Sequence, residues 1–330
     1  MKNMTGSDKN GLRKTVLMKV VRDPSFPSLL ILAALIGVNF YYQSNFFSYR
    51  IMRSNLMAYT PLILAAMAQA IIIISGSVDF SIGYALSLFT CLTASIMTDA
   101  NVAPVVLLGC AVILMGSGVL NGFFIGRLKM SPLITTFATM TLFWGIAQTI
   151  LPVAGGYVPR FFYKVYRSKV FDFLPFPVLI LAAALVVWAV ISRTSLHRHI
   201  YAIGSNEEGA FASGIDVGRV RFMAHVTASI FIAMAGICLL MSMASGDFRV
   251  GQEYALNSVA AVVIGGIALT GGKGNIRGAI FGALILGLVN NIIFFAKITP
   301  FHQGFTKGVV IVAALCLGGL PQLIKDRLRS

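Results

Sequence analysis

The chain is poor in charged residues and poorest in acidic ones. Only 11% of its 330 residues are charged, and 26 Lys and Arg outnumber 11 Asp and Glu. Hydrophobic residues make up 57% of the sequence, so too little polar surface is available to cover a water-soluble domain of this size. The scarcity of charge therefore excludes a soluble protein and predicts an integral membrane protein.

Cysteine and histidine are also scarce, with four of each in the chain. The cysteines lie inside apolar tracts without a CxxC pair, which argues against disulfides and zinc ligation. No histidine has a carboxylate at the spacing of a metal site or a catalytic triad, so all four are interpreted as isolated polar residues. We therefore expect no cofactor, no metal and no catalytic site. These residues are Cys91, Cys110, Cys238 and Cys316, and His197, His199, His225 and His302.

The net charge of +15 does not indicate nucleic-acid binding. The basic residues flank apolar tracts, where orientation in a membrane accounts for them. Basic residues also precede the first apolar tract, but no small-residue cleavage site follows that tract. We therefore expect no removable signal peptide and a first helix that stays in the membrane as an anchor.

Ten segments are apolar and long enough to be membrane spans, for which about 20 residues suffice. They predict an all-α, polytopic membrane protein of about ten helices, some short or broken. We expect a cytoplasmic segment at 1–24, one membrane domain at 25–322 and a cytoplasmic tail at 323–330. The expected spans are 25 to 42, 55 to 75, 78 to 98, 103 to 125, 132 to 153, 174 to 192, 222 to 243, 255 to 271, 276 to 297 and 306 to 322.

The distribution of Lys and Arg predicts the orientation of these spans. With ten spans, 17 basic residues lie on the side of both termini and 9 lie on the other side. The positive-inside rule then places both termini and the polar loop 193–221 in the cytoplasm. On the outer side, loop 153–173 combines aromatic and basic residues. This composition favours an amphipathic segment at the membrane surface over a docking site for another protein.

An acidic residue lies between the second and third expected spans, in the sequence SGSVDFSIG at 75–83. A carboxylate at that depth needs water, a helix N-terminus or a partner. Gly76 and Ser77 can end one helix, and Asp79 with Ser81 can cap the next, where the helix dipole favours negative charge. We favour this capping role over a direct role in a transport path or gate.

Small residues recur every four positions in two segments and predict flat helical faces for close packing. The first stripe holds Asn121, and the ninth span holds Asn290 and Asn291, whose buried amides need hydrogen-bond partners. For the two asparagines of the ninth span, bonds between helices are favoured over contact with a transported molecule. The stripes are Gly118, Gly122 and Gly126, and Gly274, Gly278 and Gly282, the second of which follows Gly265 and Gly266.

The sequence TGGKG at 270–274 is not a phosphate-binding loop. The spacing required before the lysine and the Ser or Thr required after it are missing. Its glycines instead favour a tight re-entrant bend whose backbone is satisfied by the surrounding protein.

A polar island at 193–221 interrupts the apolar sequence. Paired acids at Glu207 and Glu208 are followed by alanines and by a break at Ser213 and Gly214. This order predicts a short surface helix that ends in a tight turn. A membrane protein needs such a loop when a soluble partner must push on it.

Four segments together resemble the permease subunits of bacterial ABC importers of the ribose and simple-sugar type. They are 75–83, 121–136, 200–216 and 258–291, and both their order and their spacing match. The resemblance implies two permease subunits around a central path, two ATP-binding subunits on the cytoplasmic loops and a periplasmic substrate-binding protein. It also implies an inner-membrane location, no ATP site in this chain and a simple sugar or related polyol as the substrate.

The same resemblance implies roles for individual residues. The sequence departs from the family at Ser77, which replaces a glycine, and near Ala255 and Asn257, where the family has acids. The residues implied to couple the permease to the ATPase are Tyr201, Gly204, Asn206, Glu207, Glu208, Ser213 and Gly214. The residues that we consider for a path or gate, on their own polarity within the spans, are Asp79, Ser81, Asn121, Asn290 and Asn291.

Other classes of membrane protein stay open as alternatives. ABC permeases for nucleosides or branched-chain amino acids have related folds. An ion-coupled secondary transporter also uses broken helices and membrane acids, but Asp79 is the only acid that we place in an apolar tract. A membrane-embedded enzyme is disfavoured because the sequence offers no set of nucleophile, base and metal ligands. The lack of fixed charge in the spans favours a neutral substrate.

Overall fold

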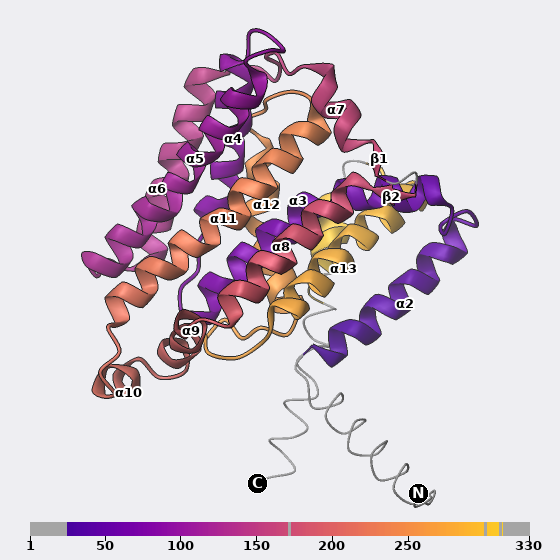
Figure 1. Cartoon of the computed structure of the whole chain (residues 1–330). Coiled ribbons are helices and arrows are strands. Elements are labelled where there is room, and N and C mark those ends of the chain that lie inside the picture. The colour runs from indigo at the N-terminus through magenta and orange to yellow at the C-terminus, as the bar shows by residue number, and fades with distance from the viewer. Residues whose placement is uncertain (1–24, 171–172, 300–301, 310–311, 313–330) are drawn as a thin grey trace, which may run out of the picture.

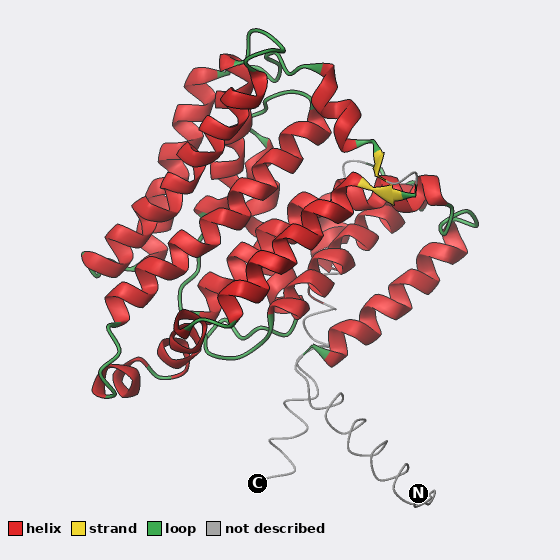
Figure 2. Ribbon diagram, in the orientation of Figure 1, coloured by secondary structure: helices red, strands yellow, loops and turns green. Residues whose placement is uncertain are grey.

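The computed structural model describes residues 25–170, 173–299, 302–309 and 312. These residues form a bundle of helices with short connections at its two ends (Figure 1). Figure 2 shows helices almost throughout the described chain, with one antiparallel pair of short strands, β1 (Lys169–Val170) and β2 (Leu174–Pro175). The prediction of an all-α membrane protein is confirmed, whereas the expected terminal segments 1–24 and 323–330 lie outside the described residues.

Helices occupy nine of the ten segments that we expected to span the membrane. The tenth, 306 to 322, lies mostly outside the described residues. The nine are α2 (Phe26–Tyr42), α3 (Tyr49–Ile74), α4 (Ser81–Ile96), α5 (Ala103–Gly122), α6 (Pro132–Ile150), α8 (Phe176–Ser192), α11 (Val217–Met243), α12 (Val250–Ile264) and α13 (Ile276–Phe295).

Five of these helices are long and apolar enough to cross a membrane alone: α3, α5 together with the π-helical turn η1 (Phe123–Arg127), α6, α11 and α13. A sixth is added if α8 and α9 (Ser195–Ser205), which meet at 78°, count as one broken span. The others are shorter, with 17 residues in α2, 16 in α4 and 15 in α12. Short and broken helices were part of the expectation.

Proline sets the beginnings of several helices. A proline lies in the first turn of each of the helices α2, α5, α6 and α8: Pro27, Pro104, Pro132 and Pro177. The N–H groups of a first turn have no partner within the helix, so a proline there costs no hydrogen bond, and its fixed φ already suits a helix. Pro61 instead lies inside α3, which a helix surrounded by protein within a membrane tolerates.

Helix α3 is the centre of the bundle. Its most apolar stretch is 94% buried, and it packs against α11, α12 and α13. The corresponding stretches of α5 and α6 are only 33% and 28% buried. These two helices therefore leave most of their surface to lipid or to another subunit.

Helix α12 begins earlier than the sequence suggested. Its first residue is Val250, five positions before the expected start at 255, and it ends at Ile264 instead of 271. Glu253 consequently lies in its first turn. This carboxylate is exposed and pairs with Lys307, so it does not add an acid inside an apolar tract.

The glycine stripes mark the closest contacts between helices. A Cβ on Gly118 would lie 2.4 Å from the carbonyl oxygen of His225, and a Cβ on Gly126 would lie 2.4 Å from the carbonyl oxygen of Gly218. Helix α5 and η1 therefore approach the backbone of α11 closely. Gly122 packs in the same way against Phe222. Such contacts leave no room for a side chain.

The second glycine stripe is shorter than expected. Gly278 and Gly282 of α13 press against α12 at Gly265 and Ala261. Gly274 is not part of that stripe, because it lies before α13 with φ 117°. Gly266, with φ 81°, lies in the turn that follows α12.

Candidate functional site

Two groups of residues are candidates for the functional site, one buried in the bundle and one at its end. The first, the polar cluster, consists of Asp79, Ser81, Asn121 and His225. The second, the docking platform, is residues 195–216, which form α9 and α10 (Glu207–Ala212) and the turn after them. Figure 1 shows α9 and α10 at the end of the bundle opposite to α7 (Arg160–Tyr166) and the two strands.

The polar cluster lies where the chain breaks between α3 and α4. Gly76, with φ 83°, ends the turn after α3, and residues 77–79 have no regular structure. Their backbone needs partners inside the bundle. The side-chain amide of Gln69, oriented to satisfy both bonds, donates to the Asp79 carbonyl (2.9 Å) and accepts from the Asp79 N–H (3.2 Å). Gln69 of α3 thereby satisfies both backbone groups of Asp79 in the irregular segment.

Asp79 is only 2% exposed, and its carboxylate binds the first residue of α4. Its Oδ1 accepts hydrogen bonds from the backbone N–H of Ser81 (2.7 Å) and from the Ser81 hydroxyl (2.6 Å). The helix cap position itself is occupied by Phe80. A negative charge next to the first N–H groups of a helix is stabilised by these groups and by the helix dipole.

The second carboxylate oxygen of Asp79 faces two other helices. Asn121 of α5 donates through Nδ2 to Asp79 Oδ2 (3.1 Å) and to Ser81 Oγ (2.8 Å). The His225 Nδ1 of α11 lies 3.6 Å from the same Asp79 oxygen. Three residues far apart in the sequence therefore meet at the start of α4.

His225 is not the polar surface residue that we expected. Only 1% of it is exposed, and its two ring nitrogens, like Asn121 Oδ1, have no hydrogen-bond partner within the described chain. The imidazole therefore lies against the buried carboxylate inside the bundle. The sequence did offer one signal: His225 lies in an apolar helix, as does Asn121 of the glycine stripe that packs on it.

The asparagines of α13 do not belong to the polar cluster. Asn291 donates through Nδ2 to Asn55 Oδ1 of α3 (3.2 Å), which is a bond between helices. Asn290 is exposed on the surface of the bundle. The structure thus brings together three of the five residues proposed for a path or gate and separates the other two.

In the docking platform, α9 packs beneath the turns at this end of the bundle. The Tyr201 hydroxyl donates to the Gly274 carbonyl (2.9 Å), and burial raises the pKa of Tyr201, so the hydroxyl keeps its proton. A Cβ on Gly204 would lie 1.9 Å from the Ile74 carbonyl oxygen. Three of the sequence motifs therefore form one layer: the platform, the TGGKG turn and the break after α3.

Side-chain hydrogen bonds and a glycine fix both ends of helix α10. Asn206 caps it by accepting from the Gly209 N–H through Oδ1 (2.9 Å). At the other end the Ser213 hydroxyl donates to the Gly209 carbonyl (2.8 Å), and Gly214 takes φ 82°. The Ile215 N–H then returns to the Ala210 carbonyl (3.1 Å), which closes the turn as a C-terminal glycine motif.

The paired acids of α10 have different surroundings. Glu207 forms a two-pronged ion pair with Arg221 of α11, with N···O distances of 2.6 and 3.1 Å. Glu208 is exposed, and no hydrogen bond or ion pair of its side chain occurs within the described residues. Phe211 is 73% exposed on the same short helix. Of the two acids, only Glu208 is thus free to meet another protein.

A groove of about 1130 Å³ runs between α10, η1 and the first turn of α11. Its walls carry charges of both signs and the exposed ring of Phe211. Arg127 and Lys129 line it from the side of η1, and Glu208 and Asp216 line it from the side of the platform. Mixed charge around an exposed aromatic ring is typical of a surface that binds a protein.

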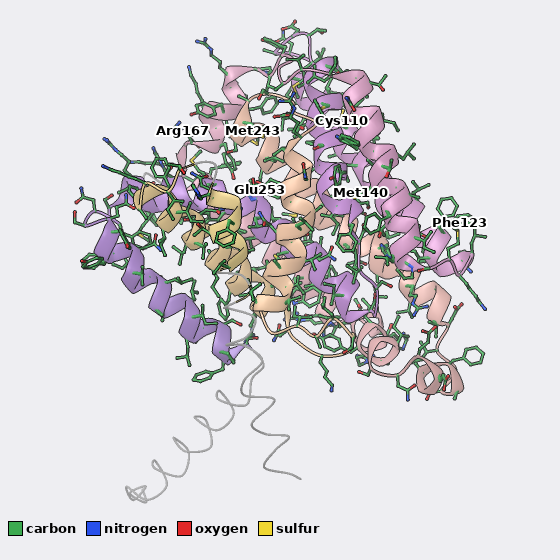
Figure 3. All side chains as sticks on the ribbon, turned by 180° about the vertical axis from the view of Figure 1, so that it is seen from behind. Cys110, Phe123, Met140, Arg167, Met243 and Glu253 are labelled. Carbon is green, nitrogen blue, oxygen red and sulfur yellow. The ribbon has the colours of Figure 1, made fainter. Side chains whose placement is uncertain are left out.

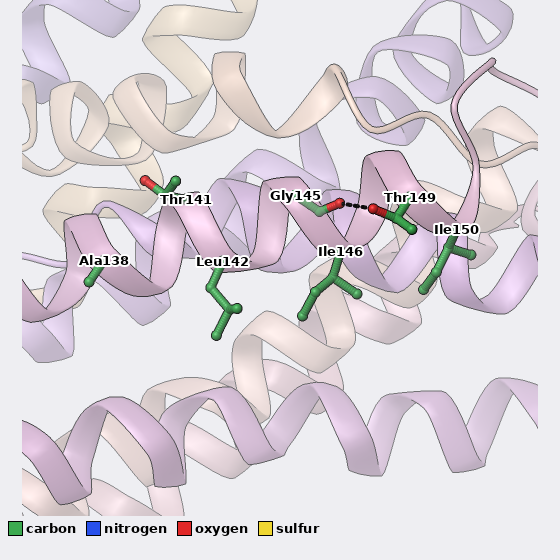
Figure 4. Close-up of a pocket in the computed structure, with 7 residues that line it drawn as sticks. All are labelled: Ala138, Thr141, Leu142, Gly145, Ile146, Thr149 and Ile150. Atoms are coloured by element: carbon green, nitrogen blue, oxygen red, sulfur yellow. Dashed lines mark hydrogen bonds between the residues drawn. The ribbon is translucent and has the colours of Figure 1, made fainter.

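A second hollow, of about 770 Å³, lies along the exposed side of α6 (Figure 4). In the close-up, Leu142, Ile146 and Ile150 project on one side of the helix, and the Thr149 hydroxyl donates back to the Gly145 carbonyl (2.8 Å). The hydroxyl is thereby satisfied within the helix. This face is suited to apolar contacts and not to binding a polar molecule.

Comparisons with known proteins agree with this arrangement. The family profile described as branched-chain amino acid transport system / permease component matches residues 51–315. The ribose import permease protein RbsC of Bacillus subtilis (strain 168) is 36% identical over 260 residues, which cover 77% of this chain and 80% of that protein. No solved structure matches the chain.

Two further relatives extend the comparison. The ribose import permease protein RbsC of Escherichia coli (strain K12) is 29% identical over 336 aligned positions, covering 97% of this chain and all of that protein. The L-arabinose transport system permease protein AraH of the same strain is 35% identical over 207 residues, covering 62% and 63% of the two chains.

Proposed function

Because the chain belongs to the permease family described as the branched-chain amino acid transport system / permease component, we propose that it forms the membrane path of an ATP-driven importer. The proposed substrate is a simple sugar or related polyol. The observation that carries this choice is the similarity along nearly the whole chain to a ribose import permease. The relatives named for L-arabinose and D-allose support the same substrate class over branched-chain amino acids or nucleosides.

The ATPase subunit docks on the platform at residues 195–216. This assignment is supported by the exposure of Glu208 and Phe211 and by the groove beside α10. Tyr201 and Gly204 contact the interior turns and not the surface, so they act by holding the platform in place. Asn206, Ser213 and Gly214 set the ends of α10, which fixes the direction in which the helix presents Glu208.

The remaining parts of the assembly follow from the family and from the charge distribution. A second permease subunit, identical or related, completes the path, and a periplasmic binding protein supplies the substrate. The platform end faces the cytoplasm of a bacterial cell, together with both termini, because most Lys and Arg lie on that side. The membrane is accordingly the inner membrane.

Coupling in this proposal runs through α11. Glu207 ties α10 to Arg221, and one turn later His225 lies against Asp79 at the start of α4. Movement of α10 therefore reaches the break between α3 and α4 through a single rigid helix. Asp79 serves in this scheme as a cap of α4 and as its contact with α11.

Reconstitution with ATPase and binding protein tests the proposal. ATP hydrolysis should increase only when the binding protein carries its sugar, and radiolabelled D-ribose is a suitable first substrate. Sugar uptake driven by a proton gradient without ATP would favour an ion-coupled transporter instead. Glu253 does not support that alternative, because it is exposed and paired with Lys307 at 2.5 Å.

A further inference from the structure

A cavity of about 570 Å³, the α9–α11 pocket, lies between α9 and the first two turns of α11. It shares the turn at 214–216 and Arg219 with the docking groove beside α10. Unlike that groove, it extends along α11 to Val220 and Met223. Met223 lies in the segment that we expect to span the membrane, so the pocket reaches from the end of the bundle into the membrane.

The lining of this pocket changes from charged to apolar along α11. Arg219 lies in the first turn of the helix, and Val220 and Met223 follow it. Because an α-helix rises by about 1.5 Å per residue, Met223 lies about 6 Å deeper than Arg219. Helix α9 adds one polar side chain, His199, and one apolar side chain, Leu196. Such a lining matches a molecule that has a charged head and an apolar chain.

The surroundings of the pocket indicate its level in the membrane. Val190, in the last turn of α8, is 62% exposed, and the chain then turns through 78° into α9. Phe123 of η1 is 47% exposed and projects from the bundle in Figure 3, and its neighbour Gly122 packs against Phe222 of α11. Apolar side chains exposed at this level are suited to contact with lipid chains. Met223 therefore lies at the level of the lipid chains, and the beginning of α11 lies at the level of the headgroups.

The charges in the pocket favour an anion. The guanidinium of Arg219 and the ring of His199 have no hydrogen-bond or ion-pair partner within the described residues, and Arg219 is exposed. Asp216 is the one acid among the residues described as lining the pocket, and its Oδ1 caps α11 by accepting from the Arg219 N–H (2.9 Å). Helices α8 and α9 contain no acid. A free guanidinium fits phosphate oxygens through two parallel hydrogen bonds.

We propose that the α9–α11 pocket binds an anionic phospholipid. Arg219 and His199 hold its phosphate, and Leu196, Val220 and Met223 contact the beginning of its acyl chains. Basic pockets between helices at the end of a membrane span are suited to such headgroups. The bound lipid joins α9 to α11 and thereby supports the docking platform. This inference depends on the membrane fold alone and not on the transported substrate or the ATPase.

The test measures lipid binding to the purified full-length chain in detergent by native mass spectrometry. Phosphatidylglycerol and phosphatidylcholine with the same acyl chains are the two probes. We expect the wild type to bind a first phosphatidylglycerol about tenfold more tightly than phosphatidylcholine, because of the charge-assisted bonds to its phosphate. Arg219→Gln should lose most of this preference. Arg198→Gln is the matched control, since it removes the same charge from an exposed residue of α9 that does not line the pocket.

Other outcomes would overturn the inference. Equal binding of the two lipids by the wild type would do so, as would equal losses in Arg219→Gln and Arg198→Gln, which would indicate general attraction to surface charge. Competition by sn-glycerol 1-phosphate at the lipid concentration would assign the pocket to a soluble phosphate ester instead. If Arg219→Gln does not fold, His199→Gln replaces it, and an unchanged preference in that variant would speak against the pocket. None of these results affects the proposed function, because neither sugar nor ATP is present.

Discussion

Asp79 shows what a buried acid contributes at the scale of a single residue. It accepts bonds from Ser81 and Asn121 and lies beside His225, all of them buried. A carboxylate with this many partners cannot be replaced by an apolar side chain without leaving the partners unsatisfied. Leaving one buried hydrogen-bonding group unsatisfied costs about 1–3 kcal/mol.

We therefore predict different results for two substitutions of Asp79. Asp79→Asn keeps an oxygen for the first N–H groups of α4 and should retain most transport, with a small loss of stability. Asp79→Leu should lower the yield of folded protein and its melting temperature in detergent. Normal folding of the Asn variant together with abolished transport would show that the charge itself acts in the pathway.

The ion pair of Glu207 and Arg221 holds α10 in position on α11 but adds little to the stability of the fold. The side chain of Glu207 is 51% exposed, and exposed pairs contribute only about 0.2–1 kcal/mol. Loss of the pair should therefore leave the fold intact and loosen the link between α10 and α11.

We predict that Glu207→Gln keeps normal levels in the membrane but transports less sugar for each ATP hydrolysed. The exchanged variant Glu207→Arg/Arg221→Glu should recover part of that ratio, because the pair is restored with opposite polarity. Glu208→Gln provides the comparison, since it should weaken ATPase binding without changing the ratio in the assembled complex. An unchanged ratio in Glu207→Gln would contradict the link.

These residues also mark what the sequence could reveal. The contact of Asp79 with Ser81 follows from their spacing at a helix start. The contacts with Asn121, 42 residues away, and with His225 require the packing of three helices, which no local pattern encodes. The different surroundings of Glu207 and Glu208 were hidden for the same reason.

At the scale of helices, apolar length predicted most elements and failed at their ends. Nine expected spans are helices, because long apolar runs have few other structures in a membrane. The start of α12 was missed because Gln252, Glu253 and Tyr254 are too polar to extend an apolar run, yet they are helical. The bend between α8 and α9 was likewise hidden, because polar residues follow the bend and no proline or glycine marks it.

The contact of α5 with α11 gives a prediction with an internal control. Gly118→Ala should destabilise the protein by about 1–3 kcal/mol, because its Cβ would lie 2.4 Å from a backbone oxygen of α11. Gly116→Ala, two residues earlier in the same helix, has nothing within 4 Å of the new Cβ and should be neutral or slightly stabilising. Thermal unfolding in the same detergent compares the two, and equal melting temperatures would contradict the tight contact.

For the whole molecule, the structure separates two ends and the charges assign each end to a side of the membrane. The platform lies at one end, and α7 and the two short strands lie at the other (Figure 1). The numbers of basic residues, 17 against 9, favour the platform end as the cytoplasmic one. Six of the nine basic residues assigned to the outer side lie in residues 43–56 and 157–170, which weakens that bias without reversing it.

Single-cysteine labelling of intact cells can test this orientation. Ser44 and Ser205 are exposed at opposite ends, and the described native cysteines, Cys91, Cys110 and Cys238, are buried, so only Cys316 needs prior replacement by serine. A membrane-impermeant maleimide should label Ser44→Cys directly and Ser205→Cys only after permeabilisation. The reverse pattern would place the platform outside, where no ATPase could reach it, and would overturn the proposed function. Labelling of both from one side would contradict the fold itself, because the bundle holds the two positions apart.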